Sequence, residues 1–376
     1  MKTRVIRLHM VGAGGEDLAA LREAGALIRR GALVAFPTET VYGLGANAFD
    51  AEAAAKIYAA KGRPSDNPLI VHIGRMEDLP LVVEGGIGTC ARILMARFWP
   101  GPLTLIFPKN PQVPDATTGG LATVAVRFPA NEIARRLILE AGVPIAAPSA
   151  NTSGRPSPTT VAHVIEDLDG KIDMILDGGE VGIGLESTIV DLTGDRPVLL
   201  RPGAVTAEML EEALRGALYP DTGSPGTESL GLHPKAPGMK YRHYAPRAQM
   251  YVVEECADIP GLARSAAESG KRVGVLCTEE TAGEIDKTCG GGFGTQSPNR
   301  LDRCMGKCIV KCIGKRADLS TVAAGLFGAL RDLDHLGVDV IYAESYPREG
   351  IGLAIMNRLV KAAGGNVISG KAGERM

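Results

Sequence analysis

Four cations between residues 61 and 201 stand where a ligand with negative charge could reach them. Lys61 and Arg63 flank a glycine and precede a proline, so a restrained loop presents two positive charges. Arg127 follows the apolar run 124–126, and a cation in a buried strand needs an anionic partner. Arg201 ends another apolar run. Such side chains bind phosphate or carboxylate. A solvated charge pair or an internal salt bridge is the alternative interpretation.

Hydroxyl and glycine residues gather in three further segments that follow or enter apolar runs. Residues 37–45 read PTETVYGLG, residues 148–159 read PSANTSGRPSPT, and residues 186–188 read EST. Such loops allow a backbone to approach a small polar ligand closely, although structural turns have a similar composition. Because no metal-binding pattern of His, Cys and Asp accompanies them, the simplest substrate is a nucleotide. Neither the G-x4-G-K-[ST] loop nor the G-x-G-x-x-G fingerprint is present.

The elements that must position these residues alternate between helix and strand. Apolar residues at helical spacing predict helices, and short apolar runs that end at turn residues predict strands. The predicted helices are 16–30, 51–60, 89–98 and 132–141, and the predicted strands are 33–36, 69–73, 103–107, 124–128 and 145–147. This alternation is typical of an α/β fold, in which ligands bind at the ends of strands.

The length of 376 residues favours two domains. We predict a first domain over 1–217 and a linker over 218–246 that is rich in Pro, Gly and Ser. A smaller α/β domain is predicted over 247–376, with strands at 250–253, 272–276 and 340–343 and helices at 262–269 and 319–336.

Composition excludes several classes of protein. Hydrophobic residues make up 45% and charged residues 22%, as in a folded globular protein, and no run approaches 18 apolar residues. The first residues lack the apolar stretch of a signal peptide, so we expect a cytoplasmic protein without a membrane anchor. The net charge of −2 provides no general positive field for nucleic acid. Cys304, Cys308 and Cys312, spaced by four, should share one face of a strand or helix as reduced thiols, and no metal held by protein side chains is expected.

Taken together, the motifs closely resemble the YrdC-like threonylcarbamoyl-AMP synthase family. The motifs, in the family's order, are PTETVYGLG, KGRPSDNPLIVH, FWPGPLT, VAVRFP, PSANTSG and ESTIVD. The resemblance covers residues 16–210, and PGMKYRHYAP, LFGALRDLD and AIMNRL extend it to the family's long two-domain form. It implies a YrdC-like twisted open sheet with helices, followed by a smaller Rossmann-like α/β domain.

The resemblance also implies an activity, which is that of a nucleotidyltransferase. Its substrates would be L-threonine, bicarbonate or CO2, and ATP with Mg2+, and its products threonylcarbamoyl-AMP and pyrophosphate. A separate transferase would use the product to modify tRNA, and direct tRNA binding is not expected. The residues that match the family's catalytic positions are Lys61 and Arg63. The matches around threonine are Thr40, His72, Arg127, Ser149 and Ser187. The matches around ATP are Arg63, Asn67, Thr123, Asn151, Thr159 and Arg201. Since a carbamate is easily lost to water, we expect the linker residues Lys240, Tyr241 and His243 to form a lid.

The sequence disfavours two other functions. A carbamoyl transferase of hydrogenase maturation shares a YrdC-like domain, but it would require acylphosphatase-like and zinc-finger domains and C-x2-C pairs, which this chain lacks. An RNA-binding module would use a basic, aromatic sheet face, whereas aromatic residues are 4% of the chain and the cations lie in ligand-type loops.

Overall fold

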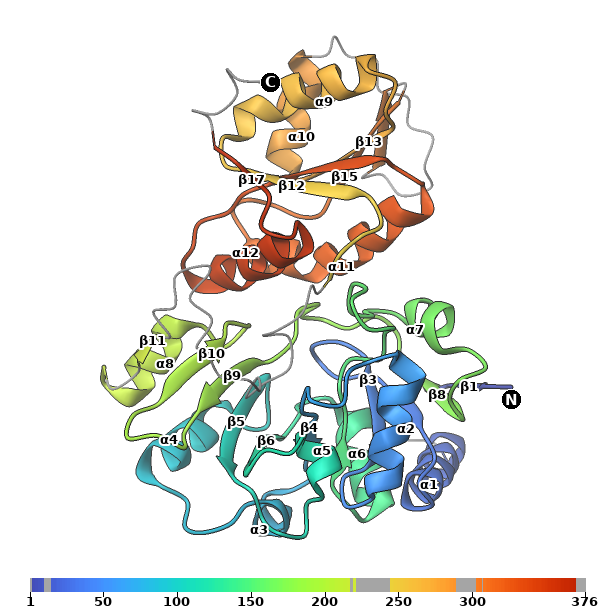
Figure 1. The fold of residues 1–376 in the computed structure, drawn as a ribbon, viewed down its shortest axis with the longest axis vertical. Coiled ribbons are helices and arrows are strands. Elements are labelled where there is room, and N and C mark those ends of the chain that lie inside the picture. The colour runs from blue at the N-terminus through green and yellow to red at the C-terminus, as the bar shows by residue number, and fades with distance from the viewer. Residues whose placement is uncertain are drawn as a thin grey trace. The chain divides into compact units, whose positions relative to one another are not determined.

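The computed structural model describes residues 2–9, 15–216, 219–220, 244–288, 302–305 and 307–369. The chain divides into two compact units, one of residues 1–153 and 157–241, the other of residues 154–156 and 242–376. Each unit has its own sheet with helices packed on it (Figure 1). The predicted α/β fold class is therefore confirmed for both parts of the chain. The boundary predicted at residue 217 lies outside the described residues.

The first unit is built on an eleven-stranded mixed sheet. In spatial order its strands are β1 (Arg4–Arg7), β8 (Met174–Asp177), β2 (Val34–Phe36), β3 (Gly43–Asn47), β7 (Ile145–Ala146), β4 (Ile70–His72), β6 (Thr123–Arg127), β5 (Leu103–Pro108), β9 (Thr188–Asp191), β10 (Val198–Arg201) and β11 (Tyr219–Pro220). All the strands predicted in this part of the chain are among them.

The helices of this unit pack on its sheet, and the four predicted from periodicity lie where expected. They are α1 (Gly15–Arg29), α2 (Ala51–Lys61), α3 (Leu79–Val82), α4 (Thr89–Phe98), α5 (Asp115–Thr118), α6 (Glu132–Ala141), α7 (Val161–Leu168) and α8 (Ala207–Leu214), with a 3-10 turn at Met76–Asp78. Alternation along β2 explains how both faces are covered. Phe36 packs in the core cluster that contains residues of α1 and α6, and Ala35 packs in the cluster that contains residues of α2 and α4.

Strand β3 was not expected, because the sequence Gly-Leu-Gly was interpreted as part of a loop. Gly45 lies against the Phe36 ring, and a Cβ at this position would come within 2.8 Å of the Phe36 Cε1 atom and 2.9 Å of the Ile145 Cγ2 atom. The two neighbouring side chains thus take the space that a side chain would need. Glycine is found here because of close packing, which overrides its low strand propensity.

Strands β4 and β6 are parallel neighbours, and their register determines which polar residues share an edge of the sheet. His72 pairs with Arg127 at the carboxyl ends of the two strands. Thr123 begins β6, and Asn67 lies three residues before β4. His72 and Arg127 therefore lie at one edge of this strand pair, and Asn67 and Thr123 lie toward the opposite edge.

The second unit has a six-stranded sheet that is parallel apart from one strand. Its spatial order is β14 (Asp302–Met305), β15 (Cys308–Cys312), β13 (Val273–Cys277), β16 (Val340–Glu344), β12 (Gln249–Val253) and β17 (Val367–Ile368), with only β14 antiparallel to its neighbour. Helices α9 (Ile259–Glu268) and α10 (Glu279–Thr288) cover one face, and α11 (Leu319–His335) and α12 (Gly350–Ala362) cover the other (Figure 1). A 3-10 turn at Cys256–Asp258 precedes α9. This is the Rossmann-like arrangement that was predicted.

The prediction that Cys304, Cys308 and Cys312 share one element was wrong. Cys304 lies in β14, whereas Cys308 and Cys312 begin and end β15. The two strands form an antiparallel pair in which Cys304 is opposite Ile309. A turn between the strands interrupts the regular spacing, and the spacing alone gave no sign of that turn.

A buried carboxylate at the carboxyl end of β16 connects the segments that follow β13 and β15. Glu344, which has no exposed surface, accepts a hydrogen bond from the Thr278 backbone N at 2.7 Å. Arg316 donates to the same carboxylate from Nη2 at 2.7 Å and from Nε at 3.2 Å. A buried charge that loses its partner is costly, so this ion pair should contribute to the stability of the second unit.

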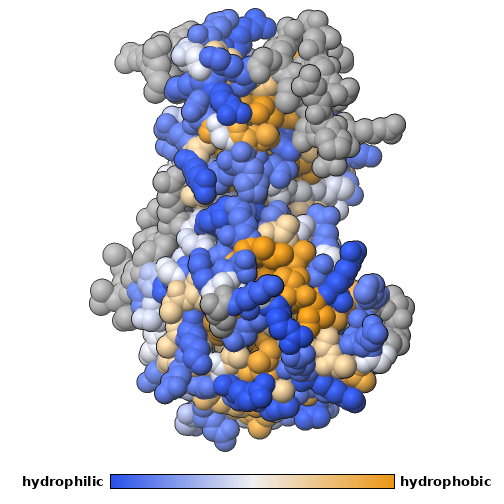
Figure 2. Space-filling model, turned by 90° about the vertical axis from the view of Figure 1, so that its right-hand side faces the viewer, coloured by the Kyte–Doolittle hydropathy of each residue, from blue (hydrophilic) through white to orange (hydrophobic). Residues whose placement is uncertain are grey.

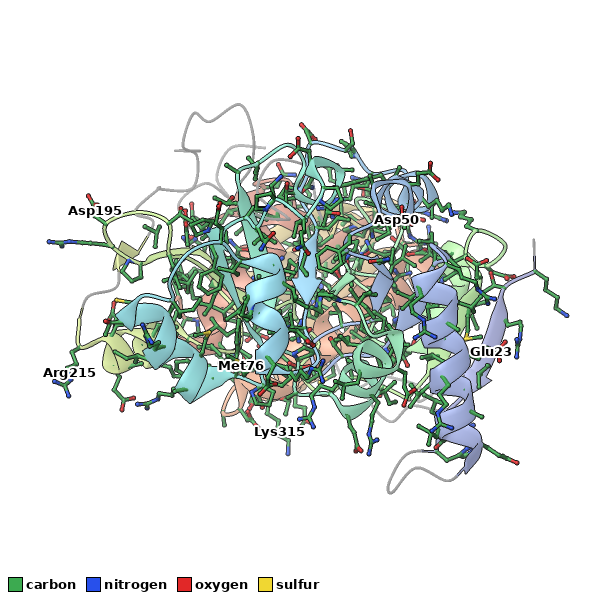
Figure 3. All side chains as sticks on the ribbon, turned by 90° about the horizontal axis from the view of Figure 1, so that it is seen from below. Glu23, Asp50, Met76, Asp195, Arg215 and Lys315 are labelled. Carbon is green, nitrogen blue, oxygen red and sulfur yellow. The ribbon has the colours of Figure 1, made fainter. Side chains whose placement is uncertain are left out.

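We expect Arg316→Ala to destabilise the second unit by about 2 kcal/mol, below the usual cost of breaking a buried pair because the arginine side chain is 46% exposed and water can replace part of it. Hydrogen exchange at the Thr278 amide should accelerate. Lys315→Ala is the matched control, because the exposed Lys315 (Figure 3) is the neighbouring cation. Adding Glu344→Gln to Arg316→Ala should restore part of the stability, because the carboxylate charge is then absent. Equal hydrogen exchange of the Thr278 amide in Arg316→Ala and Lys315→Ala would contradict the role of the ion pair.

The surface of the first unit carries a gathering of hydrophobic residues bordered by hydrophilic ones (Figure 2). None of the helices in the described residues is long and apolar enough to cross a membrane.

Candidate functional site

Helix α2 delivers Lys61 to the site, and both of its ends are fixed by local chemistry. The Asp50 carboxylate (Figure 3) accepts hydrogen bonds from the backbone N of Glu52 and Ala53, which are otherwise unpaired in the first turn. Gly62 ends the helix with a φ of 59°, a left-handed conformation that glycine adopts without strain. The chain therefore turns sharply between Lys61 and Arg63.

Lys61 is 2% exposed and holds the loop that carries Ser149 and Asn151. Its Nζ donates to the backbone carbonyls of both residues and lies 3.5 Å from the Asn151 Oδ1 atom. The Ser149 hydroxyl donates to the same Oδ1 atom at 2.5 Å. The structure thus brings together the predicted K-x-R and S-x-N segments, and the ammonium of Lys61 positions the second segment.

Arg63 and Asn67 belong to one compact loop. The guanidinium of Arg63 donates from Nη2 to the carbonyls of Asn67 at 3.1 Å and Pro68 at 3.0 Å. The Asn67 side chain is 2% exposed, and its Oδ1 atom has no hydrogen-bond partner among the described residues. A buried acceptor without a donor is uncommon in folded proteins, so this atom is a candidate contact for a ligand.

Arg127 lies between a hydroxyl and a carboxylate. Its Nη1 donates to the Thr40 hydroxyl at 2.9 Å, and its Nη2 lies 2.7 Å from the Glu39 Oε1 atom. Burial acts to raise the pKa of Glu39, but the Arg127 charge and several hydrogen bonds outweigh it, so the pKa lies below its ordinary value. In the structure the anionic partner of Arg127 is therefore Glu39, which is the internal salt bridge of the alternative interpretation.

His72 lies beside Arg127 and is uncharged at neutral pH. Burial lowers its pKa to about 3, and the positive charge of Arg127 acts in the same direction. Its Nδ1 atom is 3.1 Å from the Ile70 carbonyl, and since a carbonyl only accepts, Nδ1 carries the proton. The imidazole adds hydrogen-bonding capacity to the site without adding charge.

Ser187 and Arg201 are in direct contact, although the resemblance assigns them to different ligands. Arg201 donates from Nη2 to the Ser187 hydroxyl at 3.1 Å and from Nε to the Ser187 carbonyl at 3.0 Å. The hydroxyls of Ser187 and Thr104 are 2.7 Å apart, and Thr104 pairs with Arg127 across β5 and β6. The residues expected to bind threonine and those expected to bind ATP thus meet at Ser187.

Two of the predicted nucleotide residues, Thr123 and Thr159, come earlier in the chain than Ser187. Thr159 is 2% exposed, and its hydroxyl is 3.4 Å from the His163 Nδ1 atom. Thr123 begins β6, four residues before Arg127, which is about 13 Å along a strand. A nucleotide that reached both Thr123 and Arg201 would therefore have to extend along the sheet.

Lys240, Tyr241 and His243, which were predicted to form a lid, lie outside the described residues. Among the described residues, no three His, Cys, Asp or Glu side chains are grouped so that they could hold a metal ion. Glu39 and Thr104 were not predicted individually. Glu39 could have been singled out from the sequence, because it is the one carboxylate between the two threonines of the PTET segment. Thr104 could not, because its place in the site depends on the register of β5 and β6.

The neutral His72 should make the protein sensitive to acid. In the unfolded chain the pKa of His72 is about 6.5, so the unfolded state binds a proton below that pH. The folded state binds this proton only when the pH approaches about 3. Unfolding free energy should therefore decrease as the pH falls below 6.5, by up to about 1.4 kcal/mol per pH unit from this group. In His72→Asn, whose amide can replace the Nδ1 donor, chemical denaturation between pH 7 and 4 should show a shallower slope. An identical slope would contradict a neutral His72.

Comparison with known proteins gives matches along almost the whole chain. A family model of Sua5, YciO and YrdC proteins, described as "Telomere recombination", matches residues 26–203, and the model "Threonylcarbamoyl-AMP synthase, C-terminal domain" matches residues 205–364. A threonylcarbamoyl-AMP synthase of Bacillus subtilis is 50% identical over 93% of this chain and 94% of its own length. One of Pyrococcus abyssi is 48% identical over 93% and 95%. The crystal structure of P. abyssi Sua5 complexed with L-threonine superposes with a TM-score of 0.85, at 45% identity, over 98% of this chain and 99% of that one.

Proposed function

Because the chain belongs to the threonylcarbamoyl-AMP synthase family, in its long two-domain form, we propose that it makes threonylcarbamoyl-AMP and pyrophosphate from L-threonine, bicarbonate or CO2, and ATP. The enzyme is of the nucleotidyltransferase type. The observation that carries the proposal is the 50% identity with a synthase over nearly the full length of both chains.

The geometry of the site supports the assignment of the two ligands. In this proposal Arg127 binds the threonine carboxylate, and Thr40, His72, Ser149 and Ser187 supply hydrogen-bonding groups around the amino acid. A guanidinium pairs well with a carboxylate because it can donate two parallel hydrogen bonds. The structure of a relative that is 45% identical contains L-threonine, which supports this choice of amino acid.

The nucleotide would lie along the remaining predicted residues. Arg63 and Arg201 carry positive charge for the phosphates. The Asn67 Oδ1 atom, which has no hydrogen-bond partner among the described residues, offers an acceptor for an N–H group. We propose that Mg2+ enters with ATP and is held mainly by phosphate oxygens, since the described part of the chain groups no three metal-binding side chains. When bound, Mg2+ would neutralise charge on the departing pyrophosphate.

In the proposed reaction the main role of the protein is to position the reactants. The threonine amine loses a proton and its nitrogen bonds to the carbon of CO2, or to that of bicarbonate with loss of water. An oxygen of the resulting carbamate then attacks the α-phosphorus of ATP, and the bond to the bridging oxygen of pyrophosphate breaks. The contact between Ser187 and Arg201 would hold the two reactants together at this point, and Lys61 would keep the Ser149–Asn151 loop in place.

We further propose that the product is passed to a separate transferase that modifies tRNA, and that this chain does not bind tRNA itself. The net charge of −2 supports that division, because tRNA binding depends largely on cations that neutralise phosphates. Bacterial, archaeal and eukaryotic relatives carry the synthase name.

A direct assay tests the proposed reaction. The purified protein is incubated with ATP, L-threonine and isotopically labelled bicarbonate, and threonylcarbamoyl-AMP is followed by mass spectrometry. Labelled product that requires all three substrates is the expected result, with pyrophosphate released in equal amount. Pyrophosphate release that does not depend on threonine, or a complete lack of labelled product, would contradict the proposal.

A further inference from the structure

We propose that Glu39 is the binding residue for the α-ammonium group of the amino-acid substrate. This inference rests on the proposed function, in which the α-carboxylate of threonine pairs with Arg127. In the structure Glu39 pairs with the guanidinium itself, and when the substrate binds it would exchange this partner for the ammonium group.

The ion pair of Glu39 and Arg127 is close, but it leaves donors and acceptors without an aligned hydrogen bond. Its Oε1 atom is 2.7 Å from Arg127 Nη2, yet neither atom has an aligned hydrogen bond, and the Arg127 Nε atom also lacks one. The Oε2 atom accepts one long hydrogen bond of 3.3 Å from the Asn131 backbone N. Buried donors and acceptors usually have aligned hydrogen bonds, so this ion pair retains hydrogen-bonding capacity that a ligand could use.

Charge balance favours a ligand that is itself a zwitterion. Arg127 and Glu39 have side chains that are 5% and 16% exposed, so the site has little water to screen an added charge. His72 is neutral, which leaves one positive and one negative charge on the protein at this position. An α-amino acid brings one charge of each sign, and only if its carboxylate meets Arg127 and its ammonium meets Glu39 does every charge gain a partner.

The covalent structure of the substrate also fits this arrangement. The ammonium and carboxylate groups of an α-amino acid share one carbon atom. A ligand whose carboxylate reaches the guanidinium of Arg127 therefore brings its ammonium close to any group in contact with that guanidinium. Thr40 and Glu39 are such groups, and of these two only the carboxylate of Glu39 carries the opposite charge.

Two ligands separate this role from a purely structural salt bridge. L-threonine carries the ammonium group, whereas 3-hydroxybutanoate keeps the carboxylate and the hydroxyl but lacks it. Ligand-observed NMR with the full chain would measure the affinity of each for the wild type and for Glu39→Gln. Glu132→Gln, an exposed glutamate at the start of α6, is the matched control. Binding of ATP, measured separately, reports whether each variant is folded.

The expected result is that Glu39→Gln weakens the binding of L-threonine at least tenfold and leaves 3-hydroxybutanoate unchanged or bound more tightly, because the amide no longer competes for Arg127. Glu39→Asp, which retains the charge, should lie between wild type and Glu39→Gln. Unchanged threonine binding, or equal weakening of both ligands, would overturn the role of Glu39. Failure of the wild type to bind threonine at all would instead overturn the proposed function.

Discussion

Replacement of Arg127 by alanine should weaken L-threonine binding by about 100-fold or more, while ATP binding stays within a few-fold of wild type. Truncating one partner of a buried, hydrogen-bonded charge pair costs about 2–5 kcal/mol, since the other partner is left without compensation. The nucleotide should be little affected, because Asn67 and Thr123 lie toward the opposite edge of the β4–β6 strand pair. Calorimetric titration with each ligand separately would measure both effects.

Controls for this prediction distinguish charge from geometry. Arg127→Lys retains the charge but cannot form two parallel hydrogen bonds, so its threonine affinity should be intermediate. Arg136→Ala removes an exposed arginine of α6 and should change neither affinity. Equal losses of threonine and ATP affinity in Arg127→Ala would indicate a general disturbance of the fold, and an unchanged affinity for threonine would refute the carboxylate assignment.

Lys61→Met should reduce the rate of threonylcarbamoyl-AMP synthesis by at least 100-fold. Methionine fills similar space but provides no donors, so the carbonyls of Ser149 and Asn151 lose a buried partner at a cost of about 1–3 kcal/mol. A displacement of about 1 Å in a loop that positions reactants can itself cost about 100-fold in rate. Steady-state kinetics with ATP and threonine varied in turn would measure the change.

The kinetic pattern shows which role of Lys61 dominates. If it chiefly positions the loop, kcat falls more than the KM for ATP rises, and thermal stability falls as well. If it chiefly binds phosphate, the KM for ATP rises and stability is nearly unchanged. Lys56→Met, on the exposed face of the same helix, should leave kcat near the wild-type value. A fully active Lys61→Met would contradict both roles.

Most regular elements of the first unit could be predicted from the sequence, because they obey simple periodicities. The predicted helix 89–98 coincides with α4, and the predicted strand 103–107 lies within β5. Strand β3 could not be predicted in this way. Its glycines are explained only by the packing of Phe36 and Ile145, which come from distant parts of the chain. The cysteine spacing failed similarly, because it spans the turn between β14 and β15.

For the site, the residues could be predicted from the sequence, but their contacts could not. The need of Arg127 for an anionic partner followed from its position in an apolar run, and the structure identifies Glu39. Lys61 was expected to face phosphate, and its contacts with two carbonyls depend on a loop almost 90 residues away in the chain. Which polar residues share an edge of the sheet depends on strand register, which no local pattern encodes.

The length of β6 has a further consequence for how the proposed product would be held. Thr123 and Arg127 are four positions apart, about 13 Å along the strand, and a molecule touching both has to span that distance, as a nucleotide joined to an amino acid would. Joining two weakly bound fragments makes the second contact intramolecular, and affinity then rises well above that of either fragment. We therefore expect the enzyme to retain its adenylate far more strongly than AMP or threonine. Dissociation of the adenylate would then limit turnover, and an acceptor that removes the adenylate from the enzyme would control the overall rate.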